Sequence, residues 1–552
     1  MAKKKLKIIP LGGLGEIGKN MMVVEFGEDI IVIDAGLMFP NEEMLGIDLV
    51  IPDIGYLLEN KNKIRGIVIT HAHEDHIGAL PYVLPQLDVP IYCTKLAKGL
   101  ISIKLKERKA ASRVKINIMA PNSQFSLSRF KIESFPVCHS IPDAVGLIIH
   151  TPMGAIVHSG DFKLDHTPVN GIPTDLSRLA QVGAQGVLLL LSDSTYAELP
   201  GYTPSEKVVG EALEHIMVKA TGRIIITTFA SLISRIQQVI DAAAKHGRRV
   251  FIVGRSMSDN VRMANELGYL RIAENALGRM DELRNNPHEK TVILTTGSQG
   301  EPTSGLVRIA KRDHRQVNIV PGDIVILSAS PIPGNESLIN RTIDSLFKQG
   351  AEVYYGNIAQ THVHGHASQE ELKLLLRLVK PKFFMPIHGE YRHLNLHAKL
   401  AQSIGIPVEN TFVLEDGDIL ELNPHYGRIT GKVGTGNVYV DGLSVGDVGG
   451  IILRNRRMLS RDGIVVVIIA VNEQTGKLVG RPDIVSRGFV DINESKDMLE
   501  ESRDLVAKIL DHGRRHTAEW GFADSKVRDA LNRFYYQQTK RRPMILPVMV
   551  KV

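Results

Sequence analysis

The sequence is short of cysteine, tryptophan and aromatic residues in general. Its 552 residues include two cysteines and one tryptophan, and aromatic residues make up 5%. Two cysteines, Cys93 and Cys138, are too few for a disulfide scaffold or a cysteine-rich zinc module. The shortage is typical of a reducing compartment, and we expect both cysteines in the core. The low aromatic content argues against a long platform on which bases stack.

Long hydrophobic runs are also missing. The first residues, Met-Ala-Lys-Lys-Lys-Leu-Lys, are not followed by the apolar stretch of a secretory signal. No apolar run approaches the ~20 residues that a bilayer-spanning helix needs. We therefore expect a cytoplasmic protein without a membrane partner.

What is present indicates a large globular protein. Hydrophobic residues are 43% and charged residues 23% of the chain, which is the usual globular balance. At ~150 residues per domain the length predicts three or four domains. Lys and Arg number 66 against 60 Asp and Glu, a net charge of +6, which permits a polyanionic partner without requiring one.

Basic residues gather in three short runs, Lys3–Lys5, Arg454–Arg457 and Lys540–Arg542. Such runs contact phosphates and add salt-dependent affinity, or they are simply solvated faces. The last run precedes a predicted strand, so a domain or subunit contact is a third interpretation.

The pattern of apolar residues changes along the chain. The first half alternates short β-branched runs with Gly-rich turns, which predicts sheet layers with helices outside. From about Arg223 strand-like runs alternate with helical stretches such as Leu232–His246, which predicts a parallel α/β unit. The Gly- and Asp-rich segment 423–457 is predicted to be connecting structure. After it, strands at Gly463–Ala470 and Met544–Val550 and a helix at Ser495–His512 predict a compact α+β unit.

The strongest chemical signal is His71-Ala72-His73-Glu74-Asp75-His76, directly after an apolar run that predicts a strand. Imidazole nitrogen and carboxylate oxygen are preferred ligands of zinc and manganese. In an extended backbone His71 and His73 lie on the same side. Four donors within six residues do not easily serve one tetrahedral ion, so we predict two neighbouring ions. An incidental His-rich loop is the alternative, and the HxHxDH array at a strand end disfavours it.

This array resembles the metallo-β-lactamase superfamily, and the remaining elements of that pattern follow in order, each after a predicted strand. The resemblance implies two Zn²⁺ per subunit, with Mn²⁺ as the alternative, and leaves a position for a bridging hydroxide. It assigns three ligands to each ion and a shared carboxylate: His71, His73 and His139; Asp75, His76 and His388; and Asp161.

The gap between Asp161 and His388 is too long for the plain hydrolase fold. Its strand–helix pattern resembles the β-CASP branch, whose members act on nucleic acids, and Ser192–Thr195 and His362–Ala367 match motifs of that branch. Within the branch the chain resembles bacterial ribonuclease J over nearly its whole length, and four further segments carry this resemblance: Leu11–Asn20, Thr295–Pro302, Ser330–Asn335 and Thr539–Pro547. The first segment is also Gly-rich like a phosphate loop, but it lacks the Gly-Lys-Ser/Thr ending that a nucleoside triphosphate site needs.

The resemblance implies an α/β fold with three parts. These are a metallo-β-lactamase αββα sandwich, an inserted β-CASP α/β domain and a small C-terminal α+β domain. We place the sandwich at 1–207 and 362–425, the β-CASP domain at 208–361, a linker with connecting strands at 426–460, and a C-terminal oligomerisation domain at 461–552.

The activity implied is endonuclease and 5′-to-3′ exonuclease cleavage of single-stranded RNA by two-metal hydrolysis, with a preference for 5′ monophosphate ends. The processes implied are rRNA processing and mRNA decay. Asp193 and His366 are the implied acid–base pair, with their proton roles open. The terminal phosphate is assigned to Ser231 and to the segment His362, Val363, His364, Gly365 and His366. Ser231 is equally well explained as a helix N-cap, and His364 stands where the family pattern predicts a serine or a similarly small residue.

Other expectations concern assembly and a third metal. The resemblance implies a homodimer or homotetramer, with a paralogous subunit and RNA-decay proteins as further partners. It also implies a structural Ca²⁺, for which we name Leu45, Ile47 and Asp441.

Two classes of alternative stay open. One is a scaffold subunit of a ribonuclease complex with weak activity, which the complete ligand set disfavours. The other is a different enzyme of this fold that acts on DNA ends, tRNA 3′ ends or a small thioester. The Asp193 and His366 motifs disfavour small substrates.

Overall fold

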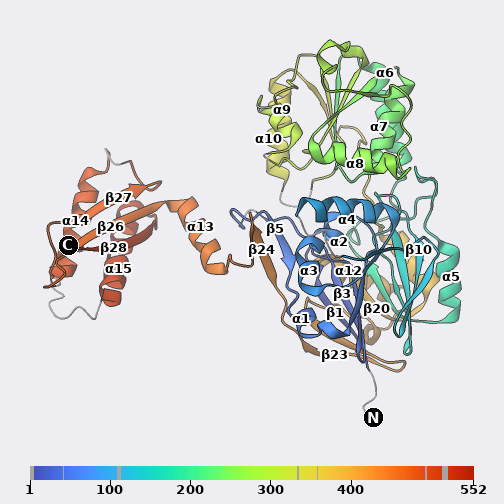
Figure 1. Cartoon of the computed structure of the whole chain (residues 1–552), viewed down its shortest axis with the longest axis horizontal. Helices are drawn as coiled ribbons and strands as arrows, with labels where there is room; N and C mark the ends of the chain where they lie inside the picture. The colour runs from blue at the N-terminus through green and yellow to red at the C-terminus, as the bar shows by residue number, and fades with distance from the viewer. Residues whose placement is uncertain are drawn as a thin grey trace. The chain divides into compact units, whose positions relative to one another are not determined.

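The structure is a computed structural model that describes residues 5–41, 43–108, 114–301, 303–331, 335–356, 358–475, 477–491, 494–511 and 520–552. The chain divides into two compact units (Figure 1), one of Met1–Phe39 with Val50–Val438 and one of Pro40–Leu49 with Tyr439–Val552. The boundaries that we predict at 207/208 and 361/362 fall inside the first unit and stay predictions. Two motif pieces, Pro302 and residues 332–334, and the basic residues Lys3 and Lys4 lie outside the described part of the chain.

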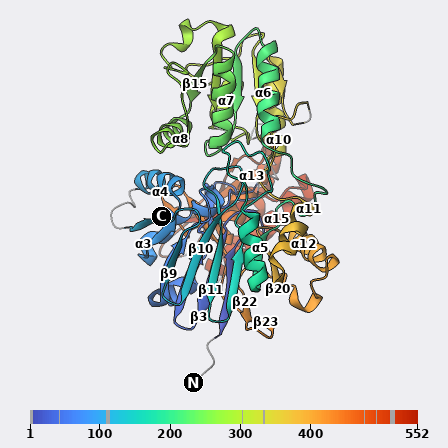
Figure 2. The ribbon, with the colours of Figure 1, turned by 90° about the vertical axis from the view of Figure 1, so that its right-hand side faces the viewer.

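Two sheets face each other in the first unit. One sheet has eight strands, in the order β23 (Gly427–Lys432), β22 (Asp418–Leu422), β1 (Leu6–Gly12), β3 (Met21–Phe26), β4 (Asp29–Ile33), β6 (Ile64–Val68), β7 (Ile91–Cys93) and β8 (Ile116–Ile118). The other has six, in the order β20 (Pro381–Ile387), β13 (Val187–Asp193), β12 (Gly154–His158), β11 (Val145–Thr151), β10 (Phe130–Pro136) and β9 (Gln124–Leu127). Figure 2 shows β9, β10 and β11 side by side.

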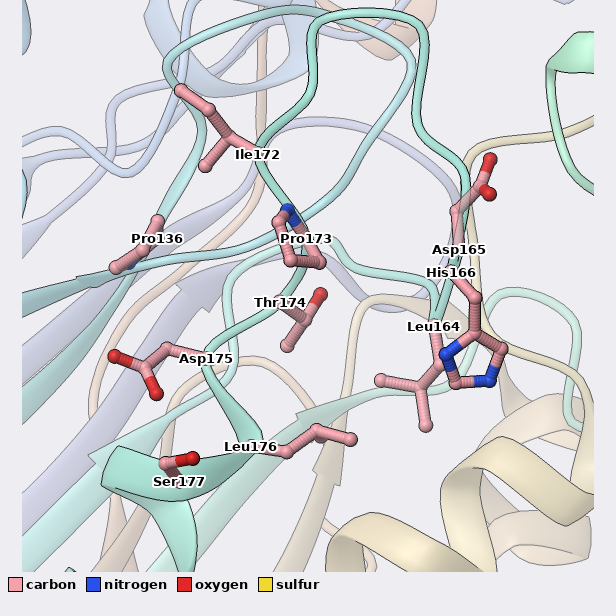
Figure 3. Close-up of a pocket in the computed structure, with 10 residues that line it drawn as sticks. All are labelled: Pro136, Leu164, Asp165, His166, Ile172, Pro173, Thr174, Asp175, Leu176 and Ser177. Carbon is pink, nitrogen blue, oxygen red and sulfur yellow. The ribbon is translucent and has the colours of Figure 1, made fainter.

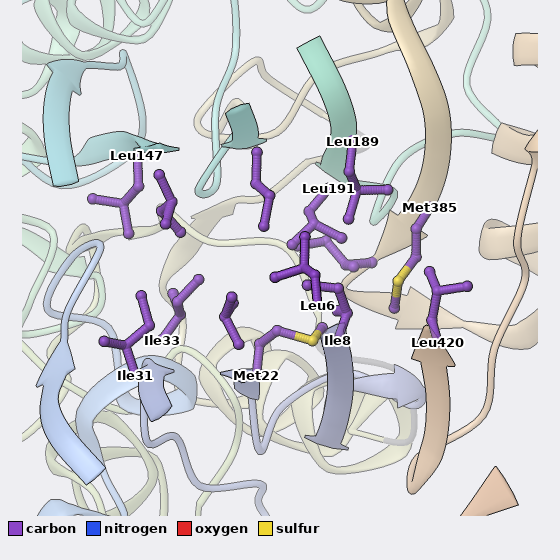
Figure 4. Close-up of a cluster of buried hydrophobic side chains, with 14 of the residues drawn as sticks. Leu6, Ile8, Met22, Ile31, Ile33, Leu147, Leu189, Leu191, Met385 and Leu420 are labelled. Carbon is purple, nitrogen blue, oxygen red and sulfur yellow. The ribbon is translucent and has the colours of Figure 1, made fainter. Parts of the chain in front are cut away.

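The interior between these sheets is apolar (Figure 4). Ile8, Met22 and Ile31 from the first sheet meet Leu189 and Met385 from the second, and all of them are buried. Burying one such side chain contributes about 1.5–3 kcal/mol relative to leaving it exposed. This apolar interior therefore stabilises the sandwich and holds the strands, and so the ends of the strands, in place.

Helices cover the outer faces of both sheets. One group is α1 (Gly55–Glu59), α3 (Leu80–Leu87) and α4 (Lys95–Glu107); the other is α5 (Leu176–Gln185), α11 (Gln369–Val379) and α12 (Tyr391–Ser403). The second group closes a separate apolar core with the outer face of β10–β13 and β20. The four layers are the αββα sandwich that the sequence predicts.

The inserted region forms a third sheet whose six strands are all parallel. Their order is β16 (Leu277–Gly278), β15 (Arg249–Val253), β17 (Thr291–Thr295), β14 (Ile224–Thr227), β18 (Ile324–Leu327) and β19 (Glu352–Tyr354). Helices α6 (Lys207–Lys219) and α7 (Ile233–Lys245) lie on one side in Figure 1, and α9 (Gly305–Ala310) and α10 (Glu336–Lys348) on the other. A further helix, α8 (Arg255–Glu266), packs against α4. This is the parallel α/β arrangement predicted from the strand–helix rhythm.

The second unit is a three-stranded sheet with helices on one face. Its strands are β27 (Asp483–Arg487), β26 (Ile464–Val471) and β28 (Met544–Lys551), and its helices are α14 (Lys496–Asp511) and α15 (Trp520–Thr539). Val467, Val506 and Leu531 are among the buried side chains that join the sheet to these helices. This confirms the predicted α+β unit.

The prediction of connecting structure over 423–457 is wrong in part. The segment contains β23, β24 (Asn437–Asp441) and most of a 13-residue helix, α13 (Gly450–Asp462). Among the residues of α13 only Leu453 is buried, so the helix lacks the apolar stripe by which helices are recognised in a sequence. None of the described helices combines the length and apolar character that a membrane span requires.

Candidate metal centre

The predicted ligands gather because several strands end at one edge of the six-stranded sheet. Neighbouring strands β12, β13 and β20 are parallel, so their carboxyl ends coincide, and Asp161 and His388 follow two of them. Strand β10 runs in the same direction, because it is antiparallel to β11 and β11 is antiparallel to β12. His139 follows β10 at the same edge.

The HxHxDH array comes from the facing sheet. Strand β6 ends at Val68, and the extended segment after it carries His71 and His73. The short helix α2 (Glu74–Ile77) then carries Asp75 and His76. The turn into α2 separates these last two donors from the first two, as two neighbouring sites require.

Three histidines form the first cluster. The Nδ1 atom of His73 lies 3.1 Å from Nε2 of His71 and 3.1 Å from Nε2 of His139. The Oδ2 atom of Asp161 is 3.6 Å from Nε2 of His71 and 3.8 Å from Nε2 of His139. Three ring nitrogens and one carboxylate oxygen thus face a common point.

The second cluster shares Asp161 with the first. Its Oδ2 atom is 3.2 Å from Nε2 of His76, and its Oδ1 atom is 3.0 Å from Nδ1 of His388. The Oδ2 atom of Asp75 lies 3.4 Å from Nε2 of His76 and 3.3 Å from Nε2 of His388. Within each cluster the donor atoms lie within 4.8 Å of one another, so the structure brings all seven predicted ligands together.

Protonation in the first cluster suits a divalent cation, whereas in the second cluster the surrounding carboxylates outweigh burial and raise the pKa of His76 and His388, so a metal there would displace protons. Burial holds the pKa of His71 and His139 well below the usual range and lowers that of His73 to about 4, so these rings are neutral donors at pH 7. Burial acts to raise the pKa of Asp161, but the nearby His388 and His76 hold it well below its usual value. The Nε2 atom of His388 is buried and makes no hydrogen bond with any described residue. This donor set fits two divalent ions.

Groups behind the ligands fix which ring nitrogen faces the site. The Nδ1 atom of His76 lies 2.8 Å from Oδ2 of Asp34, and Nδ1 of His139 lies 2.7 Å from the carbonyl oxygen of Gly365. Each contact turns Nε2 toward the other ligands, which is the usual role of such partners. A Cβ atom at Gly365 would lie 2.6 Å from Nδ1 of His139, so only glycine fits there.

The sequence predicted no role for Asp34 or Asn20. Asp34 accepts from the backbone amide and the hydroxyl of Thr70, at 2.8 Å each, as well as facing His76. Its backbone is left-handed, with φ of 62°. Asn20 donates its side-chain amide to the carbonyl oxygen of Asp75 at 3.1 Å. The signal that could have found Asp34 is its position after β4, next to the parallel strand β6.

The predicted acid–base pair is in contact. The Oδ2 atom of Asp193 lies 2.7 Å from Nδ1 of His366, although 173 residues separate them. The other oxygen of Asp193 accepts from the amide and the hydroxyl of Thr195, at 3.0 and 2.7 Å. The ring of His366 also approaches the shared ligand, with Nδ1 3.9 Å from Oδ2 of Asp161.

The predicted phosphate segment lies beside this pair. Val363 and Gly365 are buried, His362 and His366 are half-buried, and the ring of His364 stacks on Tyr196 with centroids 3.9 Å apart. Ser231 is half-buried in the turn between β14 and α7. The interpretation of Ser231 as the N-cap is wrong, because Leu232 holds that position and its side chain makes no capping bond.

The groups named for calcium are occupied by an arginine. In the second unit the guanidinium of Arg456 donates to Oδ2 of Asp441 at 2.5 Å and to the carbonyl oxygen of Leu45 at 3.1 Å. A Cβ atom at Gly46 would lie 2.7 Å from Nη1 of Arg456, so the guanidinium fills the space beside the loop that also carries Ile47. These groups do not fit a calcium ion while Arg456 is in place.

Of two hollows in the first unit, the smaller is lined by predicted ligands and the larger is not. A cavity of about 20 Å³, room for about one water molecule, lies behind the ligands and is lined by Asn20, Asp34, His76, His158 and His388, among others. A larger pocket of about 430 Å³ is lined by Pro136, Leu164, His166, Ile172 and Asp175, among others (Figure 3). None of the predicted site residues lines the larger pocket, so its size does not mark the chemistry.

Comparisons with known proteins agree with this geometry. Family profiles match residues 14–173 as metallo-beta-lactamase superfamily, 221–346 as ribonuclease J beta-CASP domain, 350–411 as Zn-dependent metallo-hydrolase RNA specificity domain and 451–552 as ribonuclease J C-terminal domain. Ribonuclease J2 of Bacillus subtilis is 42% identical over 550 residues, which is 100% of this chain and 99% of that protein. Ribonuclease J 1 of Streptococcus pyogenes is 44% identical over 98% of this chain and 97% of its own length.

The chain belongs to the ribonuclease J family. It is therefore a metal-dependent hydrolytic nuclease, and its family places RNA as the bound substrate. A crystal structure of a protein of unknown function from Enterococcus faecalis V583 shares the fold, with a TM-score of 0.55 and 17% identity over 76% of this chain and 100% of that chain. The ribonuclease J resemblance drawn from the motifs is confirmed, and so is the fold class.

Proposed function

We propose that this ribonuclease J chain cleaves single-stranded RNA internally and from the 5′ end, prefers 5′ monophosphate ends and uses two metal ions. The single observation that carries the proposal is the position of Asp161. Its carboxylate lies 3.2–3.8 Å from the donor nitrogens of His71, His139 and His76, as a ligand shared by two ions would. We infer Zn²⁺ for both, with Mn²⁺ as the alternative.

The two clusters would hold the ions as the ligand distances suggest: His71, His73 and His139 for one, Asp75, His76 and His388 for the other, and Asp161 between them. Such a pair activates a water nucleophile and neutralises phosphate oxygens. The residues of the chain supply the rest. The Asp193–His366 pair lies beside the shared carboxylate, where it can pass a proton to the leaving 3′ oxygen.

The terminal phosphate is assigned to Ser231 and to the segment from His362 to His366. Ser231 stands in the turn that leads into α7, and amide groups at a helix N-terminus favour anions. The segment 362–366 contacts the metal centre, because the carbonyl oxygen of Gly365 accepts from His139. A phosphate held there would place the first linkage of the RNA near the metals.

Assembly and cellular role complete the proposal. We infer that the C-terminal domain, 461–552, supports a homodimer or homotetramer, and that a paralogous subunit and other RNA-decay proteins join it. The processes are rRNA maturation and mRNA decay in the cytoplasm. Sheet residues Leu546, Val548 and Val550 are exposed in this domain, which supports a subunit contact.

Replacement of His76 tests the proposal. His76→Ala removes one ligand and the ring that Asp34 orients, and we expect internal and 5′-end cleavage to be lost together with bound metal. His215→Ala is the matched control, because His215 is an exposed histidine on α6. Metal content, circular dichroism and cleavage of a 5′-labelled RNA are measured on both. Retained cleavage in a folded His76→Ala protein would refute the assignment.

A further inference from the structure

Five basic side chains of the C-terminal unit converge on one end of its sheet. Strands β26 and β28 are parallel and both begin there, whereas β27 is antiparallel to β26 and ends there: Ile464 is paired with both Arg487 and Met544. Helices α13 and α15 also end close by. The five residues are Arg461, Arg487, Lys540, Arg541 and Arg542, and all are exposed.

Hydrogen bonds fix this convergence. The backbone amide of Arg542 donates to Oδ2 of Asp462 at 3.2 Å, which ties the start of β28 to the end of α13. The guanidinium of Arg541 donates to the carbonyl oxygen of Phe489 at 2.9 Å, just beyond β27. The cluster is therefore built by the fold of the domain and is more than a run of basic residues in the sequence.

An exposed aromatic ring lies within the cluster. Tyr536 is 41% exposed, with the guanidinium carbon of Arg542 4.5 Å and the ammonium of Lys540 5.4 Å from its ring centroid. The left-handed backbone of Lys540, with φ of 57°, turns the chain back over the last turn of α15. Cations beside a tyrosine face are held by its π electrons.

These charges are not compensated. Among the described residues none of the five side chains forms an ion pair with a carboxylate, and the nearby carboxylate of Asp462 is bonded to a backbone amide. Elsewhere in the same unit Arg481 pairs with Glu500 and Asp504, and Lys551 with Glu473. Unpaired cations around an exposed ring are the combination that binds single-stranded nucleic acid, through phosphates and base stacking.

We propose that this basic edge, defined as Arg461, Arg487, Tyr536, Lys540, Arg541 and Arg542, is a second binding site for single-stranded RNA. The cations would contact successive phosphates and Tyr536 one base. The metal ligands all belong to the other unit, so the basic edge contributes affinity without taking part in hydrolysis. The inference rests on RNA as the substrate and not on the proposed mode of cleavage.

Binding to the full-length chain tests this inference. EDTA prevents cleavage, and fluorescence anisotropy gives the Kd for labelled single-stranded RNAs of about 5 and about 30 nucleotides over a range of salt. For Lys540→Ala/Arg542→Ala we expect about tenfold weaker binding of the long RNA. We also expect the salt slope, the steepness with which the logarithm of the binding constant falls with the logarithm of salt concentration, to be lower by about 1.4. Each lost phosphate contact on a single strand removes about 0.7 from this slope. The short RNA is expected to bind unchanged.

The matched control is Arg481→Ala/Lys551→Ala, which removes the same charge from exposed side chains that are already paired. Its affinity and salt slope should equal those of the native chain. Tyr536→Leu should weaken binding of the long RNA about fivefold or more without changing the slope, because stacking carries no counterion release.

Three results would overturn the inference. The first is the same Kd and slope for the Lys540/Arg542 double variant and its control. The second is a dissociated oligomer in light scattering of the double variant with unchanged RNA binding by each subunit, which would make the edge a subunit contact. The third is a double variant that no longer binds anionic phosphatidylserine vesicles but binds RNA as the native chain does. If the native chain binds the long RNA through the edge but cuts no RNA with metal added, the proposed function fails and this inference stands.

Discussion

Asp34 and His76 form a buried carboxylate–imidazole pair, with Oδ2 and Nδ1 2.8 Å apart. Asp34 directly follows β4, and His76 lies on α2, the helix that follows the neighbouring parallel strand β6. Asp34 holds a left-handed backbone conformation there, which is costly for a residue with a side chain. The contact presents Nε2 of His76 to the metal centre.

Asp34→Asn should weaken metal binding and RNA cleavage by about 10- to 100-fold, the usual effect of losing such a partner. An asparagine amide can offer its own hydrogens to Nδ1, so it no longer selects the ring form that binds metal. Metal titration and cleavage rates measure both effects. Glu74→Gln is the control, because Glu74 belongs to the same segment but pairs with Lys104. Equal losses in both variants would contradict the role of Asp34.

A second contact links the inserted domain to the loop that follows the predicted metal ligand His139. The hydroxyl of Tyr269, which follows α8, donates to Oδ2 of Asp143, and that oxygen also accepts from the amide of Leu96 at 3.3 Å. Asp143 has a left-handed backbone, with φ of 67°, and lies four residues after His139.

Tyr269→Phe should lower unfolding stability by about 1–3 kcal/mol, the cost of removing a partner from a partly buried charged acceptor. It should also lower metal affinity, because the loop after His139 loses its outer anchor. Calorimetry and metal titration are the measurements, with Tyr202→Phe, an exposed tyrosine, as the control. Unchanged metal affinity at reduced stability would limit Tyr269 to a structural role.

Ser231→Ala should reduce the preference for 5′ monophosphate over 5′ hydroxyl RNA about fivefold, which corresponds to one hydrogen bond of about 1 kcal/mol. Internal cleavage should change less, because it does not use the terminal phosphate. The measurement compares kcat/KM for the two ends and for a circular RNA. Ser258→Ala serves as control, since the hydroxyl of Ser258 is bound by the carbonyl oxygen of Gly254. The same loss on all three substrates would contradict the pocket.

Asp416 gives a pH dependence of stability. Burial and the nearby Glu16 carboxylate raise the pKa of Asp416 to about 7, against about 3.9 in an unfolded chain. Between about pH 4 and 7 the folded chain therefore keeps a proton that the unfolded chain has lost. The stability that this group contributes is complete below about pH 4, declines as the pH rises and is lost above about pH 7.

Asp416→Asn keeps the acceptor for the amide of Leu14 but removes the titration. We expect the variant to be more stable than the native chain at pH 8, by on the order of 1 kcal/mol after allowance for solvent screening, and nearly equal to it at pH 5. Thermal unfolding at the two pH values measures this. The same change in stability between pH 5 and pH 8 in the native chain and in the variant would contradict the role of Asp416.

The metal ligands could be predicted from the sequence because each stands shortly after a recognisable strand and the HxHxDH spacing is dense. The groups that orient these ligands, such as Asp34, could not be predicted from the sequence. Nothing local distinguishes Asp34 from a turn aspartate, since its contact with His76, 42 residues further along the chain, arises only when β4 and β6 become neighbours. The carbonyl of Gly365 has no side-chain signature at all.

Two other features could not be predicted from the sequence, for similar physical reasons. Helix α13 buries only Leu453 among its residues, so its apolar periodicity is too weak to read. The calcium prediction considered the oxygens of Leu45 and Asp441 without Arg456, which reaches them from α13. Long side chains that cross between segments are visible only in three dimensions.

Two-metal hydrolysis of RNA is tested most directly by cleavage of a 5′-monophosphorylated single-stranded RNA, labelled at its 5′ end, with Zn²⁺ or Mn²⁺ added. A DNA of the same sequence is the control. We predict rapid release of the labelled mononucleotide, loss of this activity in His76→Ala and no cleavage of the DNA. Intact RNA in the presence of a protein that holds two metal ions per chain would show that this chain is not a two-metal ribonuclease.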